Sequence, residues 1–176
     1  MKKVIEEQLI FGPSYSYTFT NTMQKRKKHT FYFKGSLDFS GNFAGLVMGA
    51  NSSVDQKEIA GVAFSQFTKL ETDFRHYLNL GGELELASRA IIGIGYAYGN
   101  SKELPYIKQF FVGGTNSIRA FRARAIGPGS FDGSAQNNSF LPDQSGDLKL
   151  EFNTELRGKI YSFIKGAVFI DAGNIW

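Results

Sequence analysis

The sequence predicts an all-β fold, an antiparallel meander of about six long strands with one long loop. Glycine supplies 20 of the 176 residues, which suits strands and turns better than helices. Six segments alternate apolar and polar residues with a period of two, the pattern of a strand whose two faces meet different surroundings. The connections between them are alternately short and long, as in a chain that zigzags from strand to strand. The predicted strands are 8–20, 29–40, 64–80, 83–98, 147–157 and 163–176, and the longest connection is the loop 99–146.

The first three strands each place large apolar side chains at every second position. In the first strand these are the odd positions, Tyr15 and Phe19 among them, and the even positions are small or polar. In the second strand the odd positions are again apolar, opposite polar residues such as Lys34 and Asp38. In the third strand the apolar face consists of even positions, namely Phe64, Leu70, Phe74, Leu78 and Leu80.

The last three strands keep their apolar residues at even positions. The fourth strand has isoleucines and tyrosines on this face, opposite two glutamates and an arginine. The fifth strand alternates most cleanly, and its polar face carries Glu151 and Glu155. The sixth strand sets an aliphatic face against a polar face that includes Lys165 and Asp171. Each of the six segments therefore predicts a strand with one apolar and one polar side.

These strands fit a β-barrel that spans a membrane. They are longer than the roughly 5–6 residues typical of strands in soluble proteins, and their polar faces are dense with charge. Tyrosines near the strand ends, such as Tyr15 and Tyr96, suit the interfaces of a bilayer. Short turns at one end and long loops at the other are typical of outer-membrane barrels. We therefore expect the apolar faces to contact lipid and the polar faces to line a lumen.

Six strands are too few to close such a barrel, because the smallest have about eight and a sheet in lipid cannot leave an edge unpaired. We therefore expect residues 1–176 to be a partial outer-membrane β-barrel domain that belongs to a longer chain. The N-terminal segment lacks the apolar core of a signal peptide, so we expect that signal upstream. The basic run at 25–28 would be either a solvated turn or a contact with anionic lipid headgroups.

No residue pattern in the chain predicts catalysis, a cofactor or a metal site. Cysteine is absent, and His29 and His76 are too few for a histidine-rich metal site. Gly93 and Gly95 lie inside a strand and lack the third glycine of a nucleotide fingerprint. The sequence contains no phosphate-binding loop and no nucleophile elbow. The net charge of +4 comes without an extended basic face, so nucleic acid is not expected as a partner.

The long loop contains an unusual stretch at residues 110–131. Three arginines, Arg119, Arg122 and Arg124, lie there among glycines and aromatic residues. A connector that only crosses a surface is usually hydrophilic and seldom combines large apolar residues with so much charge. We predict that this loop folds back onto the polar faces of the strands. Glu151 and Glu155 are the luminal acidic partners that we expect to receive Arg119, Arg122 or Arg124.

Three motifs follow one another in this part of the chain. Residues 113–121 read GGTNSIRAF, residues 146–157 read GDLKLEFNTELR, and residues 169–173 read FIDAG. As an ordered set they resemble the bacterial surface antigen family, the barrels of BamA/TamA-type outer-membrane assembly factors. The family carries the first motif on a loop that folds into the barrel, and the other two on the strands that follow. Ala120 departs from the pattern, because the family has glycine after the arginine.

The resemblance implies that these strands belong to a barrel of sixteen. It also implies that the loop arginine pairs inside the lumen with the aspartate of the third motif, so that Arg119 and Asp171 anchor the loop to the lumen wall. The remaining matching positions of the loop motif would support this anchor; they are Gly113, Gly114, Ser117, Ile118 and Phe121.

The resemblance further implies a non-catalytic scaffold of the bacterial outer membrane that inserts, assembles or translocates proteins. Its partners would be outer-membrane lipids, unfolded outer-membrane protein clients and periplasmic accessory proteins. Two alternatives stay open from the sequence. A barrel of this kind could serve as the membrane anchor of a patatin-like phospholipase, or as a secretion channel dedicated to one client.

Overall fold

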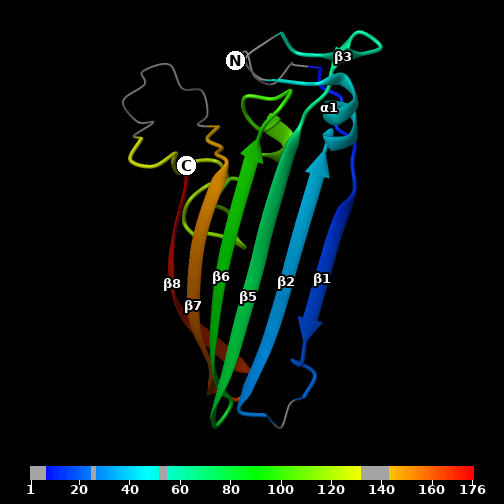
Figure 1. The fold of residues 1–176 in the computed structure, drawn as a ribbon. Coiled ribbons are helices and arrows are strands. Elements are labelled where there is room, and N and C mark those ends of the chain that lie inside the picture. The colour runs from blue at the N-terminus through cyan, green and yellow to red at the C-terminus, as the bar shows by residue number, and fades with distance from the viewer. Residues whose placement is uncertain (1–6, 25–26, 52–54, 132–142) are drawn as a thin grey trace.

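A six-stranded antiparallel sheet makes up most of the structure, a computed structural model that describes residues 7–24, 27–51, 55–131 and 143–176. The strand order is β1-β2-β5-β6-β7-β8, so neighbours along the meander are also neighbours in the sheet (Figure 1). Short turns join the strands at one end, and two long connections lie at the other. The strands are β1 (Ser14–Thr20), β2 (His29–Ser40), β5 (Phe67–Gly81), β6 (Leu84–Ala97), β7 (Leu148–Tyr161) and β8 (Ile164–Ile175).

The structure confirms the all-β meander, and the bounds of the strands differ from the predicted ones mainly at their ends. β2 begins and ends where the alternation does. β7 extends beyond the predicted end at 157 to Tyr161, which leaves a tight turn before β8. The predicted first strand pairs with β2 only from Ser14 onward. Before Ser14, the carbonyls of Pro13 and Phe11 still accept backbone hydrogen bonds from Phe39 and Gly41. Further back, Leu9 forms a parallel bridge with Phe64.

Alternation assigned Phe64 to the wrong surroundings. The sequence put Phe64 on the same apolar face as Leu70, but Phe64 is 1% exposed and Leu70 is 41% exposed. Phe64 precedes β5, where the chain bends and takes Leu9 as a backbone partner. Its ring lies 6.4 Å from that of Phe11, measured between centroids. Period-two alternation holds only within a straight strand, and it fails across this bend.

One face of the sheet is apolar and open. We call it the outer face; it carries the even positions of β5 to β8 and the odd positions of β1 and β2. Val168 and Ile170 are 74% and 71% exposed, and Ile92 near the middle of β6 is 47% exposed. Soluble monomers rarely expose a contiguous apolar surface of this kind. A barrel wall in lipid requires it.

The opposite, inner face is polar, and the strand register aligns its charged residues in rows. One such row runs from Arg75 of β5 to Arg89 of β6, Asn153 of β7 and Asp171 of β8. Directly opposite positions in an antiparallel pair bring Cβ atoms within about 4.5–5.5 Å. Side chains from four strands therefore meet on this face.

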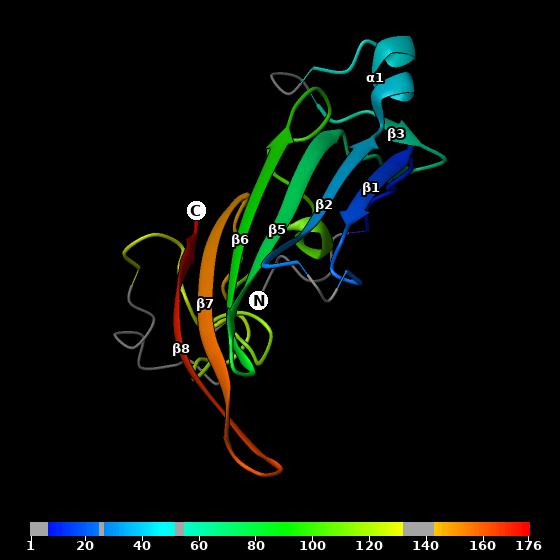
Figure 2. The ribbon, with the colours of Figure 1, turned by 90° about the horizontal axis from the view of Figure 1, so that it is seen from below.

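The described residues of the connection between β6 and β7 fold back across the inner face (Figure 2). Near its start lies the short 3₁₀ helix η2 (Tyr106–Lys108). Lys69 of β5 donates a hydrogen bond to the carbonyl of Lys108 at 2.8 Å, and its ammonium lies 4.0 Å from the centroid of the Phe110 ring. Phe110 and Gly146 then exchange two backbone hydrogen bonds of 2.8 and 2.9 Å. The described parts of the loop are thus held against the sheet at both ends.

The connection between β2 and β5 contains elements that the sequence did not predict. They are α1 (Asn42–Met48) and a small hairpin of β3 (Glu58–Ile59) and β4 (Val62–Ala63). α1 lies between two glycines, Gly41 and Gly49, whose φ angles are 66° and 60°. The positive φ of Gly49 suits the C-terminal end of a helix. Seven residues give too few turns for a clear helical period, so this helix left little signal in the sequence.

The described residues contain no helix that is long and apolar enough to cross a membrane. Nor, within those residues, do three or more histidine, cysteine, aspartate or glutamate side chains gather in a way that could hold a metal ion. The two histidines meet across strands on the outer face, where His29 Nδ1 lies 3.0 Å from His76 Nε2. In the basic run at 25–28, Lys25 and Arg26 lie outside the described residues.

A charge placed on the outer face tests its assignment to lipid. We predict that Ile92→Arg lowers the free energy of unfolding of the full-length protein in lipid vesicles by about 2–4 kcal/mol, the cost of a cation near the bilayer midplane. Urea titration followed by tryptophan fluorescence measures this loss. Ile92→Leu is the matched control, and it should cost less than about 1.5 kcal/mol. Equal stability of the two variants would contradict the lipid assignment.

Candidate functional site

Arg119 at the tip of the loop is bound to Asp171 on the inner face of β8. Its Nε and Nη2 donate to the two carboxylate oxygens of Asp171, each at 2.8 Å, and its backbone N–H donates to the same carboxylate at 3.0 Å. The side chain of Asp171 is only 3% exposed and that of Arg119 is 24% exposed. A bidentate pair with so little solvent is among the stronger and more directional of protein interactions.

Three further groups hold the same pair in place. Glu155 of β7 accepts a hydrogen bond from Arg119 Nη1. The guanidinium also lies over the ring of Phe169, 3.6 Å from its centroid. Asn153 donates to Asp171 at 3.0 Å and to the carbonyl of Ser117 at 3.0 Å. The hydrogen bonds to Asp171, followed by those to Glu155, raise the pKa of Arg119 above its ordinary value, so the arginine stays charged.

The two glycines before the arginine let the loop turn at this point. Gly113 and Gly114 both have φ near 100°, a conformation that other residues rarely adopt. A Cβ at Gly113 would also lie 2.2 Å from the carbonyl oxygen of Arg122, so the space admits only glycine there. Gly114 donates to the carbonyl of Phe121 at 2.8 Å and accepts from Ser117 at 3.1 Å, which closes the turn.

Ser117 links the loop to the fully buried Glu151 of β7. Its hydroxyl donates to Glu151 Oε2 at 2.6 Å and accepts from the backbone N–H of Gly113 at 3.1 Å. Lys149 on the same strand lies 3.3 Å from Glu151. Glu151 is 0% exposed, and burial of a carboxylate is costly unless it is paired and hydrogen-bonded. The serine of the motif therefore fixes the loop to the wall beside the arginine.

An apolar cluster fills the space between the loop and the sheet. It joins Phe110, Val112, Ile118 and Ile175, with Ile126 packed against it. At least 95% of the surface of each of the first four is buried. The loop residues are thus buried against the C-terminal end of β8, and Ile118 of the motif belongs to this small core.

Glycines on the inner face leave room for this packing. A Cβ at Gly93 would lie 2.5 Å from the ring of Phe110, and one at Gly95 would lie 2.6 Å from Leu104. A Cβ at Gly173, two residues after Asp171, would lie 2.7 Å from the backbone oxygen of Leu150. Gly93 and Gly95 of β6, which do not form a nucleotide-binding motif, therefore allow the loop to approach the wall closely.

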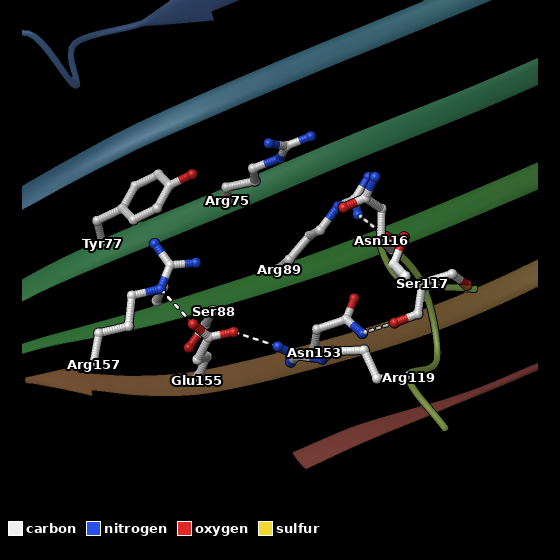
Figure 3. A pocket seen from close by; sticks show the side chains of 12 residues that line it. Arg75, Tyr77, Ser88, Arg89, Asn116, Ser117, Arg119, Asn153, Glu155 and Arg157 are labelled. Carbon is white, nitrogen blue, oxygen red and sulfur yellow. Dashed lines mark hydrogen bonds and ion pairs between the residues drawn. The ribbon is translucent and has the colours of Figure 1, made fainter. Parts of the chain in front are cut away.

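Arg89 is part of the site although the sequence gave no reason to select it. Its Nη1 donates to the carbonyl of Asn116 in the loop at 2.7 Å, and its Nη2 donates to Asp73 at 2.8 Å. Arg75 shares the same carboxylate of Asp73 at 2.7 Å. Figure 3 shows Arg89 reaching toward Asn116, with Ser117 close to Asn153 on the neighbouring strand. Only the register of β5 and β6 brings these residues together.

A cavity of about 200 Å³ lies between the loop tip and the inner face. Its polar lining includes the loop residues Thr115 and Asn116 and the strand residues Arg75, Arg89 and Arg157. Arg157 is paired with Glu155 at 2.6 Å and lies 3.7 Å from Glu85. The arginines of this cavity are thus already engaged with carboxylates of the sheet.

The other loop residues that the sequence selected lie away from the Arg119–Asp171 pair. Phe121 is 55% exposed, and only its backbone takes part in the turn. Arg122 is exposed as well. Of the three arginines, it is Arg119 that binds Glu155. Arg124 instead pairs with Asp143 at 3.3 Å and lies over the rings of Tyr106 and Phe111. The chain reverses between Arg119 and Arg124, so the two arginines point to different partners.

Ala120 adopts a backbone conformation that favours glycine. Its φ is 70°, in the left-handed region where a Cβ is unfavourable. The arrangement around Arg119 requires this turn, because the backbone N–H and the side chain of Arg119 bind the same carboxylate. Ala120 therefore carries local backbone strain.

Fold and site together define a class of protein: a piece of an outer-membrane β-barrel whose long loop is anchored to the inner wall by an arginine–aspartate pair. Residues 13–176 match the Omp85 superfamily domain, and the chain belongs to that superfamily.

One relative is the outer membrane protein assembly factor BamA of Neisseria meningitidis serogroup B (strain ATCC BAA-335 / MC58). It is 29% identical over 100 residues, which cover 56% of this chain and 12% of that protein. The chain thus corresponds to a small part of this relative's length.

Removal of one partner of the anchor should be costly. We predict that Arg119→Ala and Asp171→Asn each lower the free energy of unfolding of the full-length protein by about 3 kcal/mol, because each leaves a poorly solvated group unpaired. The double variant should lose less than the sum of the two, since the pair can be broken only once. Urea unfolding in vesicles measures all three. Arg124→Ala serves as control; its partner Asp143 is 46% exposed, so it should cost less than about 1 kcal/mol. A loss from Arg119→Ala no larger than this would refute the anchor.

The strain at Ala120 can be relieved by one substitution. We predict that Ala120→Gly raises the free energy of unfolding by about 0.5–1 kcal/mol, because glycine tolerates a positive φ. Ala123→Gly is the matched control in the same loop; its φ is not positive, so glycine there should lower stability by up to about 1 kcal/mol. Differential thermal unfolding of the two variants gives the sign directly. Destabilisation by both would contradict the strained turn.

Proposed function

We propose that this chain is part of the barrel of a factor that inserts, assembles or translocates proteins at the bacterial outer membrane. Residues 1–176 would then be a partial barrel domain of the full-length protein. In this role the chain is a scaffold, and its residues make and break no covalent bonds in the client. The observation that carries the proposal is that the described part of the long loop lies across the inner face and is anchored there by Arg119 and Asp171.

The family and the named relative support this proposal. The chain is an Omp85 superfamily member, and its relative from Neisseria meningitidis is named as an outer membrane protein assembly factor. The three motifs of the sequence coincide with the contacts that hold the loop. The first supplies Arg119 and Ser117, the second Glu151 and Glu155, and the third Asp171. An anchor built from all three motifs is expected if the position of the loop matters for function.

The loop would act as a fixed strut inside the lumen. Its contacts reach β5 through Lys69, β6 through Arg89, β7 through Glu151 and β8 through Asp171. The loop therefore contacts four strands and constrains the curvature of the sheet that they form. A barrel that assists the folding of clients needs a wall of defined shape, and such a strut supplies it. Unfolded outer-membrane proteins, membrane lipids and periplasmic accessory proteins are the proposed partners.

A reconstituted assembly assay tests the proposal. The full-length protein is refolded into phospholipid vesicles, and an unfolded outer-membrane barrel protein is added as client. We predict that the vesicles fold the client faster than empty vesicles do, and that Asp171→Asn reduces this acceleration at least several-fold by freeing the loop. Client folding is followed by the change in gel mobility of the folded barrel.

Arg124→Ala provides the control, because it alters the loop surface without touching the anchor. It should fold the client at the rate of the unmodified protein. No acceleration by the unmodified protein would overturn the assembly role. Release of fatty acid from the vesicle lipids would support the phospholipase anchor instead, and acceleration of one dedicated client alone would favour the secretion channel.

A further inference from the structure

We propose that α1 is an interfacial helix that inserts its apolar side into the membrane leaflet at the long-loop end of the barrel. The inference rests on the position and composition of the helix and does not depend on the assembly role. It assigns to the β2–β5 connection a lipid contact of its own, beyond the wall formed by the strands.

The exposed side of α1 is entirely apolar. Phe43, Leu46 and Val47 are 78%, 83% and 70% exposed. At 100° per residue these three positions fall within about 100° of one another around the helix, so they form one continuous stripe. No charged residue occurs from Gly41 to Gly49. An exposed loop in water would usually carry polar residues there.

The opposite side of the helix is packed against the end of the sheet. Ala44 is 7% exposed, and Gly45 lies so close to Gln66 that a Cβ would meet its side chain at 2.4 Å. Gln66 is itself buried, and its Oε1 accepts a hydrogen bond from the backbone of Asn100 at 3.0 Å. The helix is thus fixed to the barrel end by its small residues, and only the apolar stripe is left uncovered.

Tyrosine contacts place the helix on the outer face. Tyr98 donates to the side chain of Asn42, the first residue of α1, and its hydroxyl lies 3.0 Å from that of Thr68. Thr68 belongs to the outer face of β5, and the ring of Tyr98 lies 5.8 Å from that of Tyr96, which is 67% exposed on the outer face of β6. Tyrosines at strand ends mark the membrane interface of a barrel.

The apolar stripe therefore continues the lipid-facing wall at the level of the tyrosines. Amphipathic helices that lie in the interface bury their apolar side about 5–10 Å deep, near the boundary of headgroups and acyl chains. Uncharged residues along the whole helix suit that position better than contact with a charged partner. Figure 1 shows α1 at the upper end of β2, with the β3–β4 hairpin beyond it. The hairpin should accordingly remain in water.

Site-specific fluorescence tests the proposal, since the chain contains no cysteine. Leu46→Cys and, as control, Glu58→Cys of the exposed hairpin strand are introduced into the full-length protein, labelled with an environment-sensitive nitrobenzoxadiazole dye and refolded into phosphatidylcholine vesicles. We expect emission at position 46 to shift to shorter wavelength and to be quenched by lipids that carry a nitroxide near the headgroup. The dye at position 58 should instead be quenched by aqueous iodide.

Three results would overturn the proposal. One is emission at position 46 equal to that at 58, with equal quenching by iodide, which would place the stripe in water. Another is a blue shift without quenching by nitroxide lipid, which would mean that protein covers the stripe. The third is a blue shift that disappears as the lipid-to-protein ratio is raised, which would identify a second copy of the chain as the occupant.

Discussion

The pair formed by Arg119 and Asp171 is the contact on which the position of the loop depends. The loop tip, β7 and β8 meet here in a single charge network, because Glu155 binds Arg119 and Asn153 binds Asp171. Asp171 is almost free of solvent, so its charge is compensated only if Arg119 is present. Asp171 thus depends on Arg119 for the compensation of its charge, and the loop depends on Asp171 for its position.

Space on the inner face is the second constraint, and glycine provides it. Phe110 can lie against β6 only because Gly93 has no side chain, and Gly173 likewise lets Ile118 approach β8. The two faces of the sheet therefore differ in the side chains that they carry. Its outer face is covered with large apolar residues for lipid, whereas its inner face alternates charges with gaps that receive the loop.

Much of this was predictable from the sequence, and the failures have physical causes. Alternation located all six strands, and the three motifs selected Arg119 and Asp171, because both signals are local in the chain. The sequence alone did not select Arg89, because its role depends on a strand register that sets it beside Asp73 and beneath Asn116. Phe64 was assigned to the wrong face because it lies before the start of β5. The helix α1 was not predicted because seven residues give too weak a helical period.

The central claim is that Asp171 holds the loop tip at the inner wall, and a distance measurement tests it most directly. Spin labels at Thr115→Cys and Lys165→Cys in the full-length protein report the separation between the loop tip and β8 by pulsed electron paramagnetic resonance. The account predicts one narrow distance distribution, and a broad one shifted to longer distances when Asp171→Asn is added. A distribution that is already broad in the otherwise unmodified protein, or one that Asp171→Asn leaves unchanged, would contradict it.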